Sequence, residues 1–208
     1  MCGIAGIIAR HRITPNQRRV VESMCAALEH RGPDEIGLMQ DDVASFGVRR
    51  LAVIDLQLGQ LPIRNENETV FAFLNGEIYN YRELRDQLKR QGHRFRTQGD
   101  AEVIVHLYEE YGDAFVDHLD GMFAIALWDH LQNRLLLVRD RLGVKPLYYQ
   151  ADHAALRFGS EIKAILQDPA VRREPNYSAI DEMLTLGTST APATVFEGVW
   201  QLPPASVL

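Results

Sequence analysis

The sequence lacks several features that would assign it to a compartment or to a class of partner. It contains only two cysteines, and nothing indicates secretion, so both thiols are expected to be free in a reducing, cytoplasmic compartment. No apolar run reaches the roughly 18 residues needed to span a bilayer, and the first residues do not form a signal peptide. The net charge of −6 comes without any basic block, which argues against nucleic acid or an anionic membrane as the main partner.

Signals for metals and nucleotides are also missing. The seven histidines show no spacing typical of metal ligands, so no metal is predicted in this segment. No glycine-rich phosphate loop occurs, so no cofactor is expected within it. The composition favours a small neutral or zwitterionic substrate bound by a globular domain of 208 residues.

The feature that is present stands at the start of the chain, where Cys2 follows Met1. Removal of Met1 would place a thiol and a free α-amine on one residue. The reference pKa is roughly 7.7 to 8.0 for the amine and roughly 8.5 for the thiol, so the amine can accept the thiol proton near neutral pH. Position alone favours a plainer interpretation, a small buried side chain near a strand. Cys25 lies in an apolar stripe at helical spacing and is expected in the core.

Hydrophobic patterning predicts two groups of strands with helices between them. Without a clean βαβ repeat, this pattern favours two packed sheets covered by helices. Asn75-Gly76 is expected to open a turn, and Asp100 is expected to cap a helix. We expect strands near 4–9, 36–39, 43–48, 70–74, 122–128, 134–139, 147–150 and 154–158, and helices near 16–29, 81–91, from 100 onward and 179–186.

Ordered motifs along essentially the whole chain resemble the glutaminase domain of asparagine synthetases. This domain is a class II glutamine amidotransferase with an N-terminal nucleophile. Single motifs such as Asn-Gly are weak signals, whereas several in the same order are strong. They are Cys2-Gly3-Ile4, Arg31 to Asp34, Arg50 to Asp55, Asn75 to Asn80, Gly99 to Ile104, Leu119 to Ala124, Asp140 to Tyr149 and Phe158 to Ala164.

The resemblance implies an α+β fold, the four-layer αββα sandwich of N-terminal-nucleophile hydrolases. It also implies that residues 2–186 form the amidotransferase domain. Residues 187–208 would then be a linker and the start of an ATP-dependent synthetase domain, which receives ammonia and uses ATP and Mg. A homodimer is a further expectation from the family.

The resemblance also implies roles for individual residues. Cys2 would attack the carboxamide of glutamine and form a thioester, while the Asn75 side-chain amide and the Gly76 N–H bind the developing oxyanion. An amide beside a glycine independently offers two adjacent donors. The substrate residues implied are Arg50 for the α-carboxylate, Asp100 assisted by Glu77 for the α-ammonium, and Leu51, Val53 and Ile54 along the slot.

Other charged motif residues are expected to have structural roles. Arg31 and Asp34 would order the loop that frames the site. Structural ion pairs are as plausible as any other role for Asp140, Arg141, Glu161 and Lys163. Two departures from the family pattern, Gly99 and Glu35, affect the expected loop conformation more than the chemistry.

Two alternatives to the asparagine synthetase interpretation stay open at this point. One is a non-catalytic scaffold that docks a synthetase domain, although relatives of that kind lack the nucleophile. The other keeps the glutaminase but delivers ammonia to a carboxylate other than aspartate.

Overall fold

Two antiparallel sheets stack face to face in the computed structural model, which describes residues 1–52 and 61–208. In the first sheet the strand order is β10-β8-β9-β1-β3-β2, and in the second it is β11-β7-β6-β5-β4. The first sheet consists of β1 (Gly3–Ala9), β2 (Glu35–Gln40), β3 (Ala44–Arg50), β8 (Tyr148–Ala151), β9 (Ala155–Gly159) and β10 (Val199–Gln201). The second consists of β4 (Ile63–Arg64), β5 (Val70–Ile78), β6 (Gly121–Asp129), β7 (Arg134–Arg139) and β11 (Ser206–Val207).

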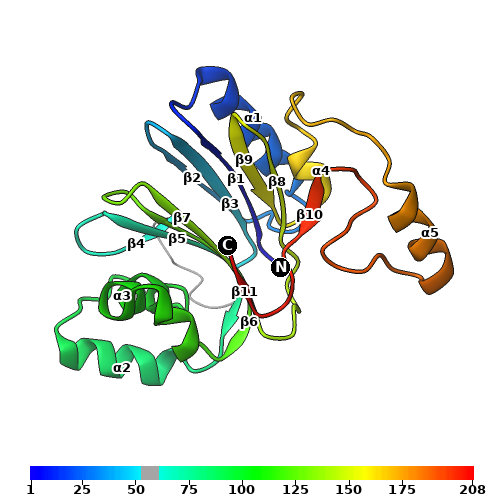
Figure 1. Cartoon of the computed structure of the whole chain (residues 1–208). Helices are drawn as coiled ribbons and strands as arrows, with labels where there is room; N and C mark the ends of the chain where they lie inside the picture. Colours follow the sequence, from blue (N-terminus) through cyan, green and yellow to red (C-terminus); the bar gives the residue numbers. More distant parts are fainter. Residues whose placement is uncertain (53–60) are drawn as a thin grey trace.

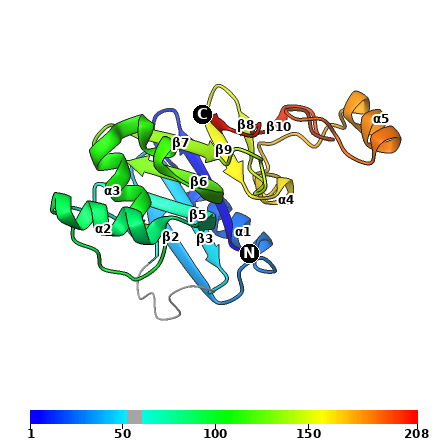
Figure 2. The same ribbon diagram turned by 90° about the horizontal axis from the view of Figure 1, so that it is seen from below.

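Helices cover the outer face of each sheet (Figure 1). The first sheet is covered by α1 (Pro15–Ala27) and α4 (Ile162–Ile165), and the second by α2 (Tyr81–Gln91), α3 (Glu102–Tyr111) and the 3₁₀ helix η1 (Gly112–His118). This arrangement confirms the predicted α+β, αββα sandwich. By contrast, α5 (Tyr177–Leu186) lies apart from the layers in both views (Figures 1 and 2).

Successive side chains of a strand point to opposite faces of the sheet, so the strands contribute to two separate cores. On β1, Ile4 faces the cluster between the sheets, while Ala5 and Ile7 face the cluster beneath α1. The space between the sheets contains edge-packed aromatic rings, with Phe46 at 5.7 Å from Phe73 and 5.6 Å from Trp128 between ring centroids. Such ring pairs stabilise the sandwich beyond the burial of their surface.

Local sequence explains where the first helix begins and which face it buries. Thr14 and Gln17 form a reciprocal capping box, and Pro15 occupies the first turn, where its missing N–H is not needed. Val21 and Cys25, one turn apart, are fully buried against the first sheet. Cys25 is therefore a core residue, as predicted.

Two local predictions were wrong. Asn75 and Gly76 do not open a turn but lie inside β5, where Gly76 pairs with Phe123. A Cβ atom on Gly76 would lie 2.1 Å from the Met122 carbonyl oxygen, so the glycine permits close approach of β6. Asp100 is not a helix cap, because α3 has Ala101 at its N-cap.

The final segment contributes an edge strand to each sheet. Residues 187–208, predicted to be a linker and the start of another domain, include β10, which pairs with β8, and β11, which pairs with β7. This segment therefore spans both layers of the sandwich. Among the described residues, no helix is long and apolar enough to cross a membrane.

Candidate active site

A cavity of about 220 Å³ brings together most of the residues that the sequence analysis selected. It lies at the start of β1 and is lined from β3, β5, β6 and the N-terminus of α3. Val53 and Ile54 fall outside the described residues. The predicted site residues that line the cavity are Cys2, Arg50, Leu51, Asn75, Gly76, Glu77 and Asp100.

The backbone on both sides of Cys2 is held by side chains distant in sequence. Arg31 Nε donates to the Cys2 carbonyl oxygen at 2.9 Å, and the Ile4 N–H donates to Ser160 Oγ at 3.0 Å. The Cys2 thiol lies 3.8 Å from the Leu51 carbonyl oxygen. These contacts fix the first residues of β1 at the cavity.

Arg31 is in turn oriented by Glu161. The two side chains form an ion pair at 3.0 Å, and Glu161 also contacts His30 at 2.9 Å and Lys163 at 3.1 Å. Burial raises the pKa of Glu161, but hydrogen bonds from Arg31, His30 and Lys163 outweigh it and lower the pKa to about 2. Glu161 and Lys163 therefore form an ion pair, one of the roles that the sequence left open for them.

Asn75 is fully buried, yet neither polar atom of its side chain has a hydrogen-bond partner among the described residues. An unpaired buried amide costs about 1–3 kcal/mol, so native structures rarely leave one without a reason. The position of Asn75 on the cavity wall supplies that reason, because a ligand in the cavity can accept from the amide.

The peptide N–H of Gly76 points to the same side of β5 as the site. On β6, the N–H and C=O of Phe123 both bond to Asp140, on the side away from β5. Gly76 and Phe123 are therefore a non-hydrogen-bonded pair of the antiparallel ladder, and the N–H of Gly76 points away from β6. Ile78, two residues further along β5, directs its N–H to the same side, where it donates to Asp100 Oδ2 at 2.9 Å.

The loop after α1 contacts the end of β3, where the Asp34 N–H donates to the Arg50 carbonyl oxygen at 3.1 Å. A Cβ atom on Gly32 would lie 2.4 Å from the Arg49 carbonyl oxygen, so only glycine permits this approach. Asp34 accepts from the Ala52 N–H at 2.8 Å. Glu35 pairs with Arg50 at 2.9 Å, which gives this departure from the family pattern a direct contact with the site.

Asp100 lines the same cavity as Arg50, although the two residues are distant in sequence. Burial raises the pKa of Asp100 and the charge of Glu77 adds to this effect, although the hydrogen bond from Ile78 opposes it. A cation bound beside this carboxylate would relieve the cost of its ionisation.

Sequence reasoning missed Lys145 and Met122, which also line the cavity. Lys145 is 7% exposed and belongs to a recognised motif, but no local signal places its ammonium group at the site. Asp140 and Arg141, for which ion pairs were an equal expectation, bond to backbone groups: Asp140 accepts from the Phe123 and Lys145 N–H groups, and Arg141 donates to the Leu119 carbonyl.

The fold is that of a solved amidotransferase. A glutamine phosphoribosylpyrophosphate amidotransferase from B. subtilis superposes with a TM-score of 0.68 and 20% identity, over 100% of this chain and 46% of that one. A structure described as the allosteric regulatory enzyme of purine biosynthesis gives 0.68 and 19%, with the same coverages. At this identity the likeness shows the fold alone.

The family model for the glutamine amidotransferase domain matches residues 1–208, and the chain belongs to this family. Similar curated proteins are glutamine-hydrolysing asparagine synthetases. Two are from Bacillus subtilis (strain 168): one is 38% identical over 100% of this chain, and the other is 45% identical over 85% of it. A third, from Zea mays, is 42% identical over 81% of this chain. The chain spans 34%, 24% and 28% of the length of these relatives.

Proposed function

We propose that this chain is the glutaminase part of an asparagine synthetase and that Cys2 is its nucleophile. The observation that supports this most directly is the unpaired, fully buried amide of Asn75 on the cavity that Cys2 lines. A hydrogen-bond donor with no partner of its own is suited to a charge that exists only during the reaction.

The reaction begins once Met1 has been removed and Cys2 has a free α-amine. The amine takes the thiol proton, and the thiolate attacks the side-chain carboxamide carbon of glutamine. The tetrahedral intermediate collapses with loss of ammonia, which receives its proton from the amine. Water then attacks the resulting thioester, releases glutamate and restores the thiol.

Two donors stabilise the tetrahedral intermediate in this proposal. The Asn75 side-chain amide and the Gly76 N–H bind the oxygen of the former carboxamide as it becomes negative. Both groups are in place before substrate binds, because β5 is paired along its length with β6. Loss of one such donor typically reduces the rate by about 10² to 10³.

The remaining residues of the cavity recognise the α-carbon end of glutamine. Arg50 binds the α-carboxylate, for which a guanidinium is well shaped. Asp100, assisted by Glu77, binds the α-ammonium. Leu51 lines the slot, and Val53 and Ile54 are proposed to continue it.

The ammonia is proposed to pass to a C-terminal synthetase domain of the same protein, which amidates ATP-activated aspartate. The greater length of the similar asparagine synthetases supports a further domain. The exposed apolar side chains of α5 suit contact with one: Tyr177 is 77%, Leu184 83% and Leu186 65% exposed. ATP and Mg would belong to that domain, the protein would work in the cytoplasm, and a homodimer is the proposed assembly.

The test compares Cys2→Ala with Cys25→Ala in the purified protein. Cys2→Ala should abolish the release of glutamate from glutamine, whereas Cys25→Ala should retain it. The glutamine analogue diazo-oxo-norleucine should add once per chain, at Cys2, as seen by intact mass and peptide mapping. The same mass spectrum shows whether Met1 has been removed.

A non-catalytic scaffold would give no adduct and no glutamate. Hydrolysis at the wild-type rate by Cys2→Ala would contradict the assignment of the nucleophile. In the full protein, amidation of aspartate with added ammonia should survive Cys2→Ala. Amidation of another carboxylate in its place would keep the glutaminase and change the acceptor.

A further inference from the structure

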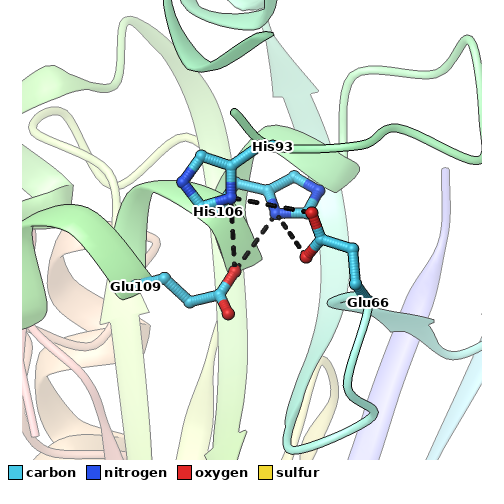
Figure 3. Close-up of side chains that lie close together, drawn as sticks. All are labelled: Glu66, His93, His106 and Glu109. Atoms are coloured by element: carbon cyan, nitrogen blue, oxygen red, sulfur yellow. Dashed lines mark hydrogen bonds and ion pairs between the residues drawn. The ribbon is translucent and has the colours of Figure 1, made fainter. Parts of the chain in front are cut away.

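Two histidines and two glutamates lie together on the outer side of the second sheet, and none of them lines the cavity. His106 and Glu109 lie on α3, His93 follows α2, and Glu66 lies in the turn between β4 and β5. One ligand atom from each of the four residues lies within 4.8 Å of all the others. Figure 3 shows the two imidazole rings side by side, with the two carboxylates directed at their nitrogens.

Three of the distances between these atoms are close to the edge length of a metal-centred tetrahedron. His106 Nδ1 lies 3.2 Å from Glu109 Oε2 and 3.5 Å from Glu66 Oε2, and His93 Nδ1 lies 3.6 Å from Glu109 Oε2. With zinc bound at about 2.0–2.1 Å, neighbouring ligand atoms of a tetrahedron are about 3.3–3.4 Å apart. All four ligand atoms lie within 4.8 Å of one another, so the side chains would move closer together to complete the coordination.

One of the two histidines is also held by its second ring nitrogen. His93 Nε2 contacts Glu110 at 2.9 Å, whereas His106 Nε2 lies 3.8 Å from Glu102 Oε1 and has no hydrogen-bond partner among the described residues. Metal-bound histidines characteristically direct the other ring nitrogen to a carboxylate.

The two carboxylates are oriented in the same way. Glu109 Oε1 accepts from Asn65 Nδ2 at 2.8 Å, and Glu66 Oε1 accepts from the Arg94 N–H at 2.7 Å. These bonds leave Glu109 Oε2 and Glu66 Oε2 directed at the histidines.

The charge around the cluster favours a cation. Within residues 1–52 and 61–208, no lysine or arginine side chain forms an ion pair with Glu66 or Glu109. His106 is fully buried beside the carboxylates of Glu66 and Glu109.

We propose that Glu66, His93, His106 and Glu109 form a structural zinc site. Two imidazoles select a transition metal over Mg²⁺ or Ca²⁺, and a tetrahedral set disfavours Cu²⁺, which prefers tetragonal geometry. Four protein ligands close the coordination sphere, as in zinc sites that stabilise a fold.

The site would clamp three segments that surround the cavity elements. It joins α3, which begins two residues after Asp100, to the hairpin whose second strand contains Asn75. The role is structural and does not depend on the proposed reaction. The sequence prediction of no metal followed histidine spacing along the chain, and His93 and Glu66 lie 13 and 40 residues before His106.

The test measures zinc in the purified protein after dialysis against zinc and then zinc-free buffer. Wild-type protein and Cys2→Ala should each retain one zinc per chain by elemental analysis, because Cys2 could otherwise bind zinc adventitiously. His93→Gln and Glu66→Gln should lose it, while His153→Gln, at an exposed histidine outside the cluster, should retain it. Using Glu66→Gln, in a surface turn, keeps the test meaningful if His93→Gln folds poorly.

Two further readouts report the role and the geometry. Zinc at a hundredfold above Kd should raise Tm by about 5–10 °C in wild type and not in His93→Gln. X-ray absorption should show two imidazole nitrogens and two carboxylate oxygens at about 2.0–2.2 Å. Failure of wild type to bind zinc would overturn the proposal, as would equal binding by His93→Gln and Glu66→Gln. In either case the cluster is only a network of hydrogen bonds and ion pairs among these side chains.

Discussion

The side chain of Arg31 holds the carbonyl oxygen of Cys2 with a 2.9 Å hydrogen bond from Nε, and its outer nitrogen pairs with Glu161 at 3.0 Å. The guanidinium therefore connects the first strand to the segment that precedes α4. A residue that was expected only to order a loop directly contacts the backbone of the proposed nucleophile.

Replacing Arg31 by Lys should reduce kcat while leaving the KM for glutamine nearly unchanged. Lysine keeps the charge but cannot contact the Cys2 carbonyl and Glu161 with one rigid fork. A hydrogen bond from a charged group is worth about 1.5–3 kcal/mol, so a fall of about tenfold or more is expected in steady-state assays. Arg10→Lys, at an exposed arginine beyond β1, is the matched control and should behave as wild type. An unchanged kcat in Arg31→Lys would show that the contact does not position Cys2.

The acid sensitivity of the fold should depend on Glu161. Its pKa is lowered from 4.5 to about 2, so its contribution to stability is complete above its unfolded pKa and is lost as the pH falls from there toward 2. Glu161→Gln should be less stable than wild type at pH 7 and should lose less stability between about pH 5 and pH 3. Urea unfolding at several pH values measures both quantities. Parallel curves for the two proteins would contradict the prediction.

Two buried asparagines offer a matched pair for separating activity from stability. Asn75 has an unpaired amide, so Asn75→Ala should reduce kcat by about 10² to 10³ with little loss of stability. Asn65 bonds to Thr69, Val70 and Glu109, so Asn65→Ala should cost about 1–3 kcal/mol and leave kcat nearly unchanged. In glutaminase assays Asn75→Ala should lose more activity than Asn65→Ala, and in urea unfolding Asn65→Ala should lose more stability than Asn75→Ala. If the same variant lost more in both measurements, the result would argue against an oxyanion-binding role for Asn75.

Asp100→Asn should stabilise the protein and weaken its binding of glutamine. Because burial raises the pKa of Asp100, the folded state binds the proton more tightly, and stability from this group declines as the pH rises through its folded pKa. Asparagine removes that cost at neutral pH, so Tm at pH 7 should rise. KM should increase by about 10-fold to 100-fold through loss of a charge-assisted bond to the α-ammonium. A glutamine analogue without the α-amino group should show no such difference between the proteins, and an equal loss would place Asp100 elsewhere in the mechanism.

Periodicity in the sequence was sufficient to predict the layers. The helix predicted over 81–91 coincides with α2, and the apolar runs near 122–128 and 134–139 correspond to β6 and β7. These elements are specified by contacts that repeat every two residues or every three to four, which a single sequence displays directly.

Features that depend on contacts between segments distant in sequence could not be predicted in this way. Asn75-Gly76 suggested a turn because the dipeptide is common in turns, whereas the reason for the glycine is the Met122 carbonyl on a neighbouring strand. The contact between Glu35 and Arg50 depends on the register of β2 with β3. The convergence of His93 with His106 depends on how α2 packs on α3, and only the His106 and Glu109 spacing on one helix face was visible in the sequence.

The placement of the two tryptophans gives the molecule two separate optical reporters. Trp128 is fully buried between the sheets, where its indole N–H donates to Asp41 at 3.0 Å, whereas Trp200 is 39% exposed on the edge strand β10. Opening of the sandwich should therefore shift the fluorescence emission of Trp128 to longer wavelength, while detachment of the last strands should alter only the emission of Trp200. With Trp200→Phe, the emission that remains reports the separation of the two sheets alone.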